Sequence, residues 1–235
     1  MKLVLLPGLD GTGRLFEPFL RELDRSIEPI VISYPSDESL DYNELVDLVA
    51  SQLPDSENFV LLGESFSGRV AFELGMRDIP NLVGIVFVCS FLESPHSRLG
   101  RIARAVPART LINVGLPAFL VRKLLLGAGA TDDLIVSFWH AVRSVDHKAL
   151  QHRIRMVLTP GNYTGILKKP AALITAAGDC LVPKRSTQDL AEHCRESVEY
   201  EIRGPHFLLQ AQPKHCAKLV GAELERMYSE IENDE

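Results

Sequence analysis

Clustered cysteines are missing from this chain of 235 residues. Its four cysteines are far apart and form no C-x-x-C motif; they are Cys89, Cys180, Cys194 and Cys216. This spacing argues against a disulfide framework and against a cysteine metal site, and predicts reduced thiols in a cytoplasmic protein. We therefore expect neither a metal ion nor another cofactor.

Long uninterrupted apolar runs are also missing. The opening stretch MKLVLLPG is too short for the apolar region of a signal peptide. Residues 111–130 are mostly apolar, but Arg122 and Lys123 interrupt them at the middle, so we expect no transmembrane segment. With 46% hydrophobic and 24% charged residues, the composition is that of a soluble globular protein.

Charge is distributed unevenly along the chain. The 25 Lys and Arg residues are outnumbered by 31 Asp and Glu residues, and we expect no nucleic-acid partner. Residues 94–169 nevertheless hold twelve basic and three acidic residues, a net charge of +9, whereas the remainder carries −15. The middle of the chain is thus basic and the rest is acidic.

A strand, a sharp turn and a helix are predicted around Ser65. Residues 59–62 are apolar without alternation, as in a strand that is covered on both faces. Gly63, Ser67 and Gly68 are small enough for the backbone to turn abruptly and for a helix to start close to the strand. Such a turn exposes a serine hydroxyl at the sheet edge, next to the N–H of Phe66. A helix-capping role for Ser65 is the simpler alternative.

The first predicted strand, residues 2–6, leads into a glycine-rich turn, Pro7 to Gly13. Its spacing is G-x-x-G-x-G, not the G-x-G-x-x-G of dinucleotide sites, and no Gly-Lys-Ser/Thr follows. The alternative to a nucleotide site is a turn that serves a nucleophile at Ser65. In that interpretation, the turn directs the N–H of Leu9 toward Ser65. Leu9 and Phe66 would then form an oxyanion hole.

Strands and helices alternate over most of the chain and predict a parallel sheet with helices on both faces. The predicted strands after the first are residues 30–33, 59–62, 82–91, 171–176 and 198–202. Between about 92 and 169 no strand is evident, and helices are predicted at 102–106, 117–126, 131–145 and 148–158. Further helices are predicted at 15–23, 41–53 (capped by Asp41), 185–193 and 207–231.

These features together resemble the α/β-hydrolase superfamily. Gly63-Glu64-Ser65-Phe66-Ser67 resembles its G-x-S-x-G motif, with serine at the fifth position, and LPGLDGTG resembles the oxyanion loop of thioesterase-like and acyltransferase-like branches. The resemblance implies about six parallel strands in the order 2-1-3-4-5-6. It also implies a core of residues 1–92 and 165–235, with an inserted helical cap at residues 93–164.

The resemblance also implies a catalytic triad of Ser65, Asp179 and His206, which occur in the order expected for the family. Asp179 follows a predicted strand, and His206 follows the last one after a Gly-Pro turn. Asp10 and Glu93 are weaker candidates for the acid. The remaining histidines fall in the predicted cap or within helices; they are His96, His140, His147, His152, His193 and His215.

The expected activity is hydrolysis of a carboxylic ester or thioester through an acyl-enzyme intermediate. Alternatives are an acyltransferase or lipid-ester synthase, a non-catalytic ligand-binding relative, and a lyase that uses the same triad. The expected substrate is a small-molecule or lipid acyl ester or thioester. The basic cap suggests acyl-CoA, acyl carrier protein or an anionic lipid surface as a partner, although its arginines could instead pair with carboxylates of the core. The apolar cap residues expected to line an acyl pocket are Phe119, Leu124, Leu125, Phe138 and Trp139.

Overall fold

The computed structural model describes residues 1–95, 115–161 and 163–232. Its centre is a six-stranded sheet in which neighbouring strands are parallel, in the order β2-β1-β3-β4-β5-β6. The strands are β1 (Lys2–Leu6), β2 (Glu28–Val31), β3 (Phe59–Glu64), β4 (Leu82–Val88), β5 (Ala171–Ala176) and β6 (Ser197–Ile202). The predicted strand order is therefore confirmed.

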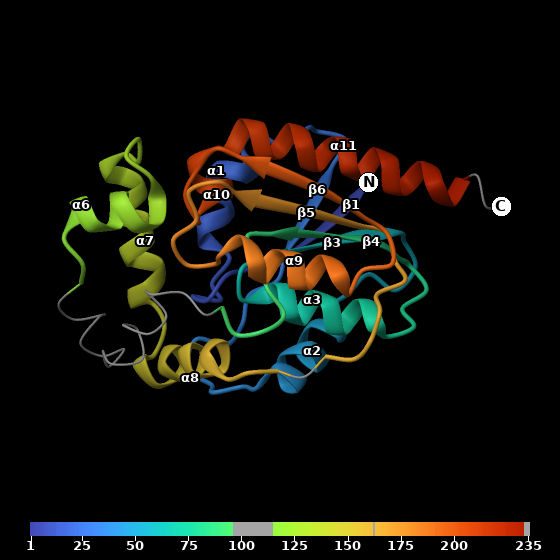
Figure 1. Cartoon of the computed structure of the whole chain (residues 1–235), viewed down its shortest axis with the longest axis horizontal. Helices are drawn as coiled ribbons and strands as arrows, with labels where there is room; N and C mark the ends of the chain where they lie inside the picture. Colours follow the sequence, from blue (N-terminus) through green and yellow to red (C-terminus); the bar gives the residue numbers. More distant parts are fainter. Residues whose placement is uncertain (96–114, 162, 233–235) are drawn as a thin grey trace.

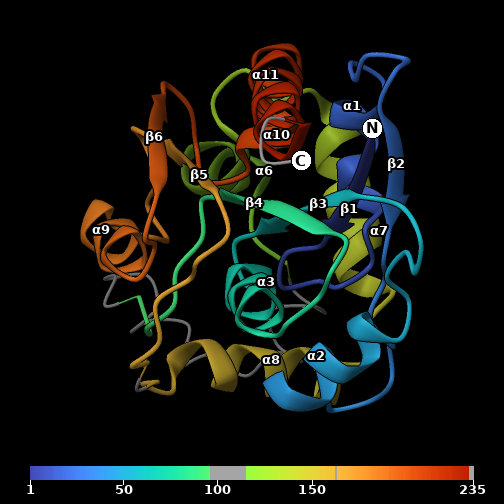
Figure 2. The ribbon, with the colours of Figure 1, turned by 90° about the vertical axis from the view of Figure 1, so that its right-hand side faces the viewer.

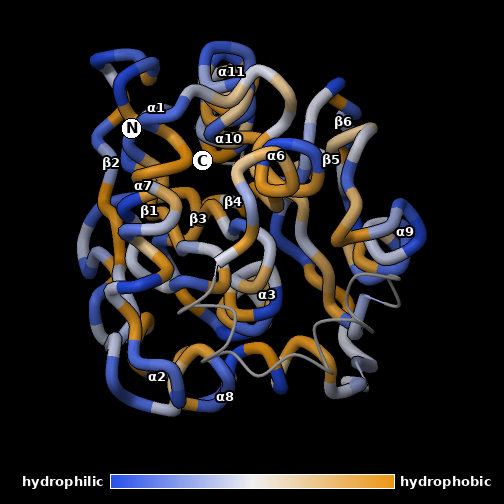
Figure 3. Tube along the Cα trace, turned by 90° about the vertical axis from the view of Figure 1, so that its left-hand side faces the viewer, coloured by the Kyte–Doolittle hydropathy of each residue, from blue (hydrophilic) through white to orange (hydrophobic). Residues whose placement is uncertain are grey.

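Helices cover both faces of the sheet, as Figure 2 shows. The helices α1 and α11 lie over one face, and α2, α3 and α9 lie over the other. Outside the segment between β4 and β5, the helical elements are η1 (Arg14–Phe16), α1 (Glu17–Leu20), α2 (Tyr42–Ala50), α3 (Ser67–Met76), α9 (Lys184–Glu192), α10 (Leu208–Ala211) and α11 (Pro213–Glu232). The central strands β3 and β4 are fully buried, in keeping with their hydrophobic colouring in Figure 3. Burial on both faces explains why their sequences do not alternate.

A capping residue marks the start of α2, and a proline divides the C-terminal helix. Asp41 caps α2, accepting from the N–H of Glu44, whose carboxylate accepts in turn from the Asp41 N–H. The helix that we expected over 207–231 is divided into α10 and α11 at Gln212. The reason is Pro213, which has no N–H and disfavours helical geometry in the residue before it.

The segment between β4 and β5 contains α6 (Ala118–Val121), the π-helical turn η2 (Arg122–Leu126), α7 (Asp132–Arg143) and α8 (His147–Leu158). In Figure 1, α6 and α7 lie beyond the ends of β5 and β6 to which the arrows point, and α8 runs along one side of the molecule. The helix predicted at 102–106 and His96 lie outside the described residues. The division into core and cap stays a prediction.

No helix in the described part of the chain is both long and apolar enough to cross a bilayer. All four cysteines are free thiols.

Candidate active site

The turn at Ser65 has the strained geometry expected from its sequence. Ser65 has φ = 51°, in the left-handed region that side chains other than glycine seldom adopt. A Cβ on Gly63 would lie 2.8 Å from the carbonyl oxygen of Ser67, and one on Gly68 would lie 2.4 Å from the Cβ of Ser90. Gly63 therefore lets helix α3 start directly beside strand β3, and Gly68 lets α3 approach the segment that follows β4.

Two hydrogen bonds join the three predicted triad residues. The Oγ of Ser65 lies 2.8 Å from Nε2 of His206, and Nδ1 of His206 lies 2.7 Å from Oδ2 of Asp179. The side chains of His206 and Asp179 are 5% and 6% exposed, so water screens their interaction little. The structure thus brings together side chains that are 141 and 27 residues apart in sequence.

Asp179 and His206 lie on two loops that are hydrogen-bonded to each other. The second carboxylate oxygen of Asp179 accepts hydrogen bonds from the N–H groups of Leu181 and Val182, both at 2.8 Å. The Gly178 N–H donates to the Gly204 carbonyl at 2.9 Å, which joins the loop of Asp179 to that of His206. These hydrogen bonds fix the orientation of the Asp179 carboxylate, so its other oxygen is already positioned for Nδ1 of His206.

The two predicted oxyanion donors lie at the start of helices or turns. Phe66 is the residue before α3, and Leu9 lies in the turn after β1. Among residues 1–95, 115–161 and 163–232, neither the Leu9 N–H nor the Phe66 N–H has a hydrogen-bond acceptor. Phe66 lies at the positive end of a ten-residue helix.

Asp10, the weaker candidate for the acid, has a structural partner instead. Its carboxylate accepts hydrogen bonds from both the N–H and the hydroxyl of Thr12, as in a turn-capping aspartate. Burial raises its pKa, and these hydrogen bonds oppose the increase. Glu93 has no hydrogen bond with His206 among the described contacts.

Glu64 and Cys89 lie at the site although their chemistry was not anticipated. Burial raises the pKa of Glu64 to about 7, against a hydrogen bond from Nε2 of Gln210 at 3.0 Å. The Sγ of Cys89 and ligand atoms of Asp179 and His206 lie within 4.8 Å of one another. Burial raises the pKa of the Cys89 thiol well above its usual range, with Asp179 and Glu64 adding to the effect, which favours a protonated thiol over a metal-binding thiolate. No sequence signal indicated its place, since the strand predicted at 82–91 includes Cys89, whereas β4 ends at Val88.

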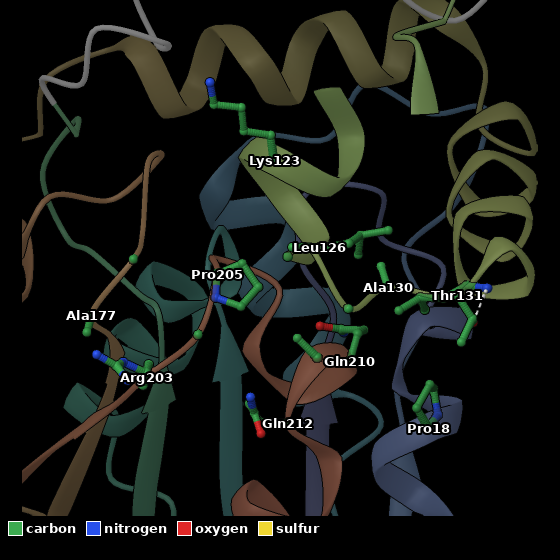
Figure 4. Close-up of a pocket in the computed structure, with 17 residues that line it drawn as sticks. Pro18, Lys123, Leu126, Ala130, Thr131, Ala177, Arg203, Pro205, Gln210 and Gln212 are labelled. Atoms are coloured by element: carbon green, nitrogen blue, oxygen red, sulfur yellow. Dashed lines mark hydrogen bonds between the residues drawn. The ribbon is translucent and has the colours of Figure 1, made fainter. Parts of the chain in front are cut away.

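The residues expected to line an acyl pocket are arranged differently. Phe138 is buried against Phe207, with ring centroids 5.5 Å apart, whereas Phe119 is 66% exposed. A cavity of about 790 Å³ lies beside the loop that precedes His206 and is lined by Leu126, Pro205, Gln210 and other residues (Figure 4). Its described lining includes neither a triad residue nor any of the five predicted pocket residues.

A sequence profile described as "Alpha/beta hydrolase family" matches residues 3–218. The chain belongs to this family. Like other alpha/beta hydrolases, it therefore has a fold that supports more than one chemistry, and its activity depends on the side chains at the site. A comparison with curated protein sequences gives no match.

Solved structures with this alpha/beta hydrolase fold include enzymes of different names. An esterase from Thermogutta terrifontis superposes with a TM-score of 0.77 at 16% identity, covering 97% of this chain and 90% of the esterase. A lipase-esterase related protein from Clostridium acetobutylicum gives 0.72 at 15% identity and coverages of 94% and 93%. A bromoperoxidase from Bacillus anthracis gives 0.76 at 18% identity and coverages of 95% and 91%. At these identities the similarity shows the fold alone.

Proposed function

We propose that this protein is a serine hydrolase that cleaves a carboxylic ester or thioester, with Ser65 as nucleophile. The observation that carries the proposal is the unbroken chain of hydrogen bonds from Ser65 Oγ through His206 to Asp179, at 2.8 and 2.7 Å. A serine hydroxyl needs an adjacent base to attack an acyl carbon at neutral pH, and the base needs an oriented ring. The likeness to proteins named as esterases adds support at the level of the fold.

The two hydrogen bonds support one proton path for the proposed reaction. Because Asp179 can only accept, Nδ1 of His206 carries the proton, which leaves the Nε2 lone pair for the hydroxyl proton of Ser65. As Oγ attacks the acyl carbon, His206 takes that proton and later gives it to the departing alcohol or thiol. Water then attacks the acyl-enzyme: His206 takes a proton from the water and donates it to Ser65 Oγ as the carboxylic acid leaves.

The charge that develops on the acyl oxygen would be held by the N–H groups of Leu9 and Phe66. Their lack of acceptors within the described residues fits this role. Donors that are already oriented stabilise the tetrahedral intermediate without reorganisation, and loss of one such donor costs roughly 10²- to 10³-fold in rate.

The substrate class includes acyl groups carried by an anionic partner. The basic segment between β4 and β5 could attract acyl-CoA or acyl carrier protein, and we place this within the proposal because residues 94–169 carry a net charge of +9. Part of this charge has another partner, since Arg122 forms an ion pair with Asp132 at 2.6 Å. Electrostatic attraction predicts that KM for an acyl-CoA rises with salt while KM for a neutral ester does not.

The test of the proposal combines labelling and substitution. A fluorophosphonate should modify Ser65 in the native protein, and Ser65→Ala should abolish both labelling and turnover of p-nitrophenyl esters without loss of stability. Ser144→Ala, which removes a hydroxyl at the end of α7, serves as the matched control. Retention of most activity by Ser65→Ala would refute the assignment. Product analysis with and without an acceptor alcohol then separates hydrolysis from acyl transfer.

A further inference from the structure

The loop that carries Leu9 has all its backbone carbonyls bound. Each carbonyl oxygen from residue 7 to residue 11 accepts a hydrogen bond from the protein. The donors are Ser67 Oγ to Pro7, the Gly11 N–H to Gly8 at 3.0 Å, Arg153 Nη1 to Leu9 at 3.4 Å and to Asp10 at 2.7 Å, and the Tyr34 N–H to Gly11 at 2.7 Å. A loop in which every backbone carbonyl accepts a hydrogen bond has few alternative conformations.

Ser67 makes the first of these contacts from the turn of the nucleophile itself. It occupies the position at which the G-x-S-x-G motif has glycine, and it is completely buried. Its hydroxyl donates to the Pro7 carbonyl and lies 2.5 Å from the hydroxyl of Tyr34. A serine has only one hydroxyl proton, so Tyr34 is the donor in the second bond. The departure from the motif thus adds a direct link between the turn and the loop.

Arg153 holds the other end of the loop from helix α8. The residue is 2% exposed, and its guanidinium donates to the carbonyls of Asp10 and Pro35, each at 2.7 Å. The guanidinium contacts the loop so closely that a Cβ on Gly11 would lie 2.4 Å from Nη1. The planar fork of an arginine can bridge two such carbonyls, and a lysine cannot reproduce this geometry.

We propose that Ser67 and Arg153 are positioning residues that hold the loop of residues 7–11 so that the Leu9 N–H faces the oxyanion formed at Ser65. The inference rests on the proposed function, because it assigns these residues a role in that reaction. Neither residue touches the reacting atoms; each acts through the backbone of the loop.

The experiment compares Ser67→Ala with Ser90→Ala. Ser90 is 2% exposed and donates its hydroxyl to the Gly63 carbonyl at 2.8 Å, so the control removes a similar buried hydroxyl that does not contact the loop. In Ser67→Ala we expect kcat to fall by about 10- to 100-fold, with KM within about twofold of the wild type. The reason is that a misplaced oxyanion donor reduces the stabilisation of the transition state and not the binding of the substrate. The pH midpoint of kcat/KM should not move, because His206 and Asp179 keep their hydrogen bonds.

Hydrogen exchange gives a readout that is independent of turnover. Amides of residues 8–12 should exchange faster in Ser67→Ala than in the wild type, while those of Ser90→Ala should not change. Tyr34→Phe, which keeps the Ser67 bond to Pro7, should cause a smaller loss of kcat. Arg153→Lys should both accelerate exchange in the loop and lower kcat, and it carries the test if Ser67→Ala does not fold.

The outcomes distinguish the two proposals. A wild-type protein that a fluorophosphonate does not label at Ser65 refutes the proposed function, and this inference with it. A labelled wild type together with unchanged kcat and loop exchange in Ser67→Ala, or equal losses in Ser67→Ala and Ser90→Ala, refutes the inference alone. Wild-type kcat and loop exchange in Arg153→Lys refute the role of Arg153.

Discussion

Gln210 donates a hydrogen bond from Nε2 to the Oε1 of Glu64 at 3.0 Å, joining helix α10 to the residue before the nucleophile. Glu64 is buried, and burial raises its pKa from 4.5 to about 7. The folded protein therefore holds the Glu64 proton more tightly than the unfolded chain does. This difference makes folding stability depend on pH.

The free energy of unfolding should therefore decrease as pH rises. The contribution of Glu64 should be complete below about pH 4.5 and should be lost as pH rises through about 7, a change of about 3 kcal/mol at most. Urea unfolding at pH 5, 6, 7 and 8 measures it. Glu64→Gln should flatten the decline, whereas Glu225→Gln, at an exposed position of α11, should not. Equal slopes in the wild type and Glu64→Gln would contradict the assignment.

Gly178→Ala should separate the loops of Asp179 and His206. A Cβ at residue 178 would lie 2.8 Å from the carbonyl oxygen of Gly204, closer than such atoms approach in proteins. We expect kcat/KM for a p-nitrophenyl ester to fall by about tenfold or more, because an error of about 1 Å in a catalytic group can cost 10²-fold. Gly129→Ala is the control, since a Cβ there would meet nothing within 4 Å. Normal activity in Gly178→Ala would mean that the two loops can shift without loss of kcat/KM.

Asp179→Asn should leave the fold intact and remove most of the activity. An asparagine can donate to Nδ1 of His206, which would place the ring proton on Nε2 and prevent it from accepting the proton of Ser65. A decrease in kcat of about 10⁴-fold is expected, by analogy with the serine protease triad. Steady-state kinetics with Asp133→Asn, at an exposed position of α7, provide the comparison. A loss of less than tenfold would assign the acid role elsewhere.

The four thiols should react in an order set by exposure. Cys180 is exposed, whereas Cys89 and Cys216 are buried and burial raises the pKa of both thiols. A short pulse of iodoacetamide should alkylate Cys180 first and should reach Cys89 and Cys216 only in denaturant. Peptide mass spectrometry identifies the modified residues. Rapid alkylation of Cys89 in the native protein would contradict its burial and would show that reagents reach the thiol beside Asp179.

The sequence was most informative where function and local structure coincide. Ser65, Asp179 and His206 each follow a strand, and parallel strands bring such positions to one edge of the sheet, so apolar runs and turns predict that edge for all three. Their choice as a triad came from the resemblance to the α/β-hydrolase superfamily. The division of the C-terminal helix was missed, because the apolar pattern continues through residues 207–231, although Pro213 marks the break. Arg153 was not predictable, since its contact with Asp10 depends on where α8 docks, and the sequence pattern of α8 does not specify the element it packs against.

The anchoring of α8 to the loop of residues 7–11 has a consequence for protein engineering. Helices between β4 and β5 are an attractive region to exchange between homologues when a new substrate range is wanted. In this protein a graft that replaces α8 would also remove Arg153, and with it the donor to Asp10 and Pro35. A working chimera would therefore have to import a compatible N-terminal turn from the same donor protein, or retain α8 and exchange only the helices before it.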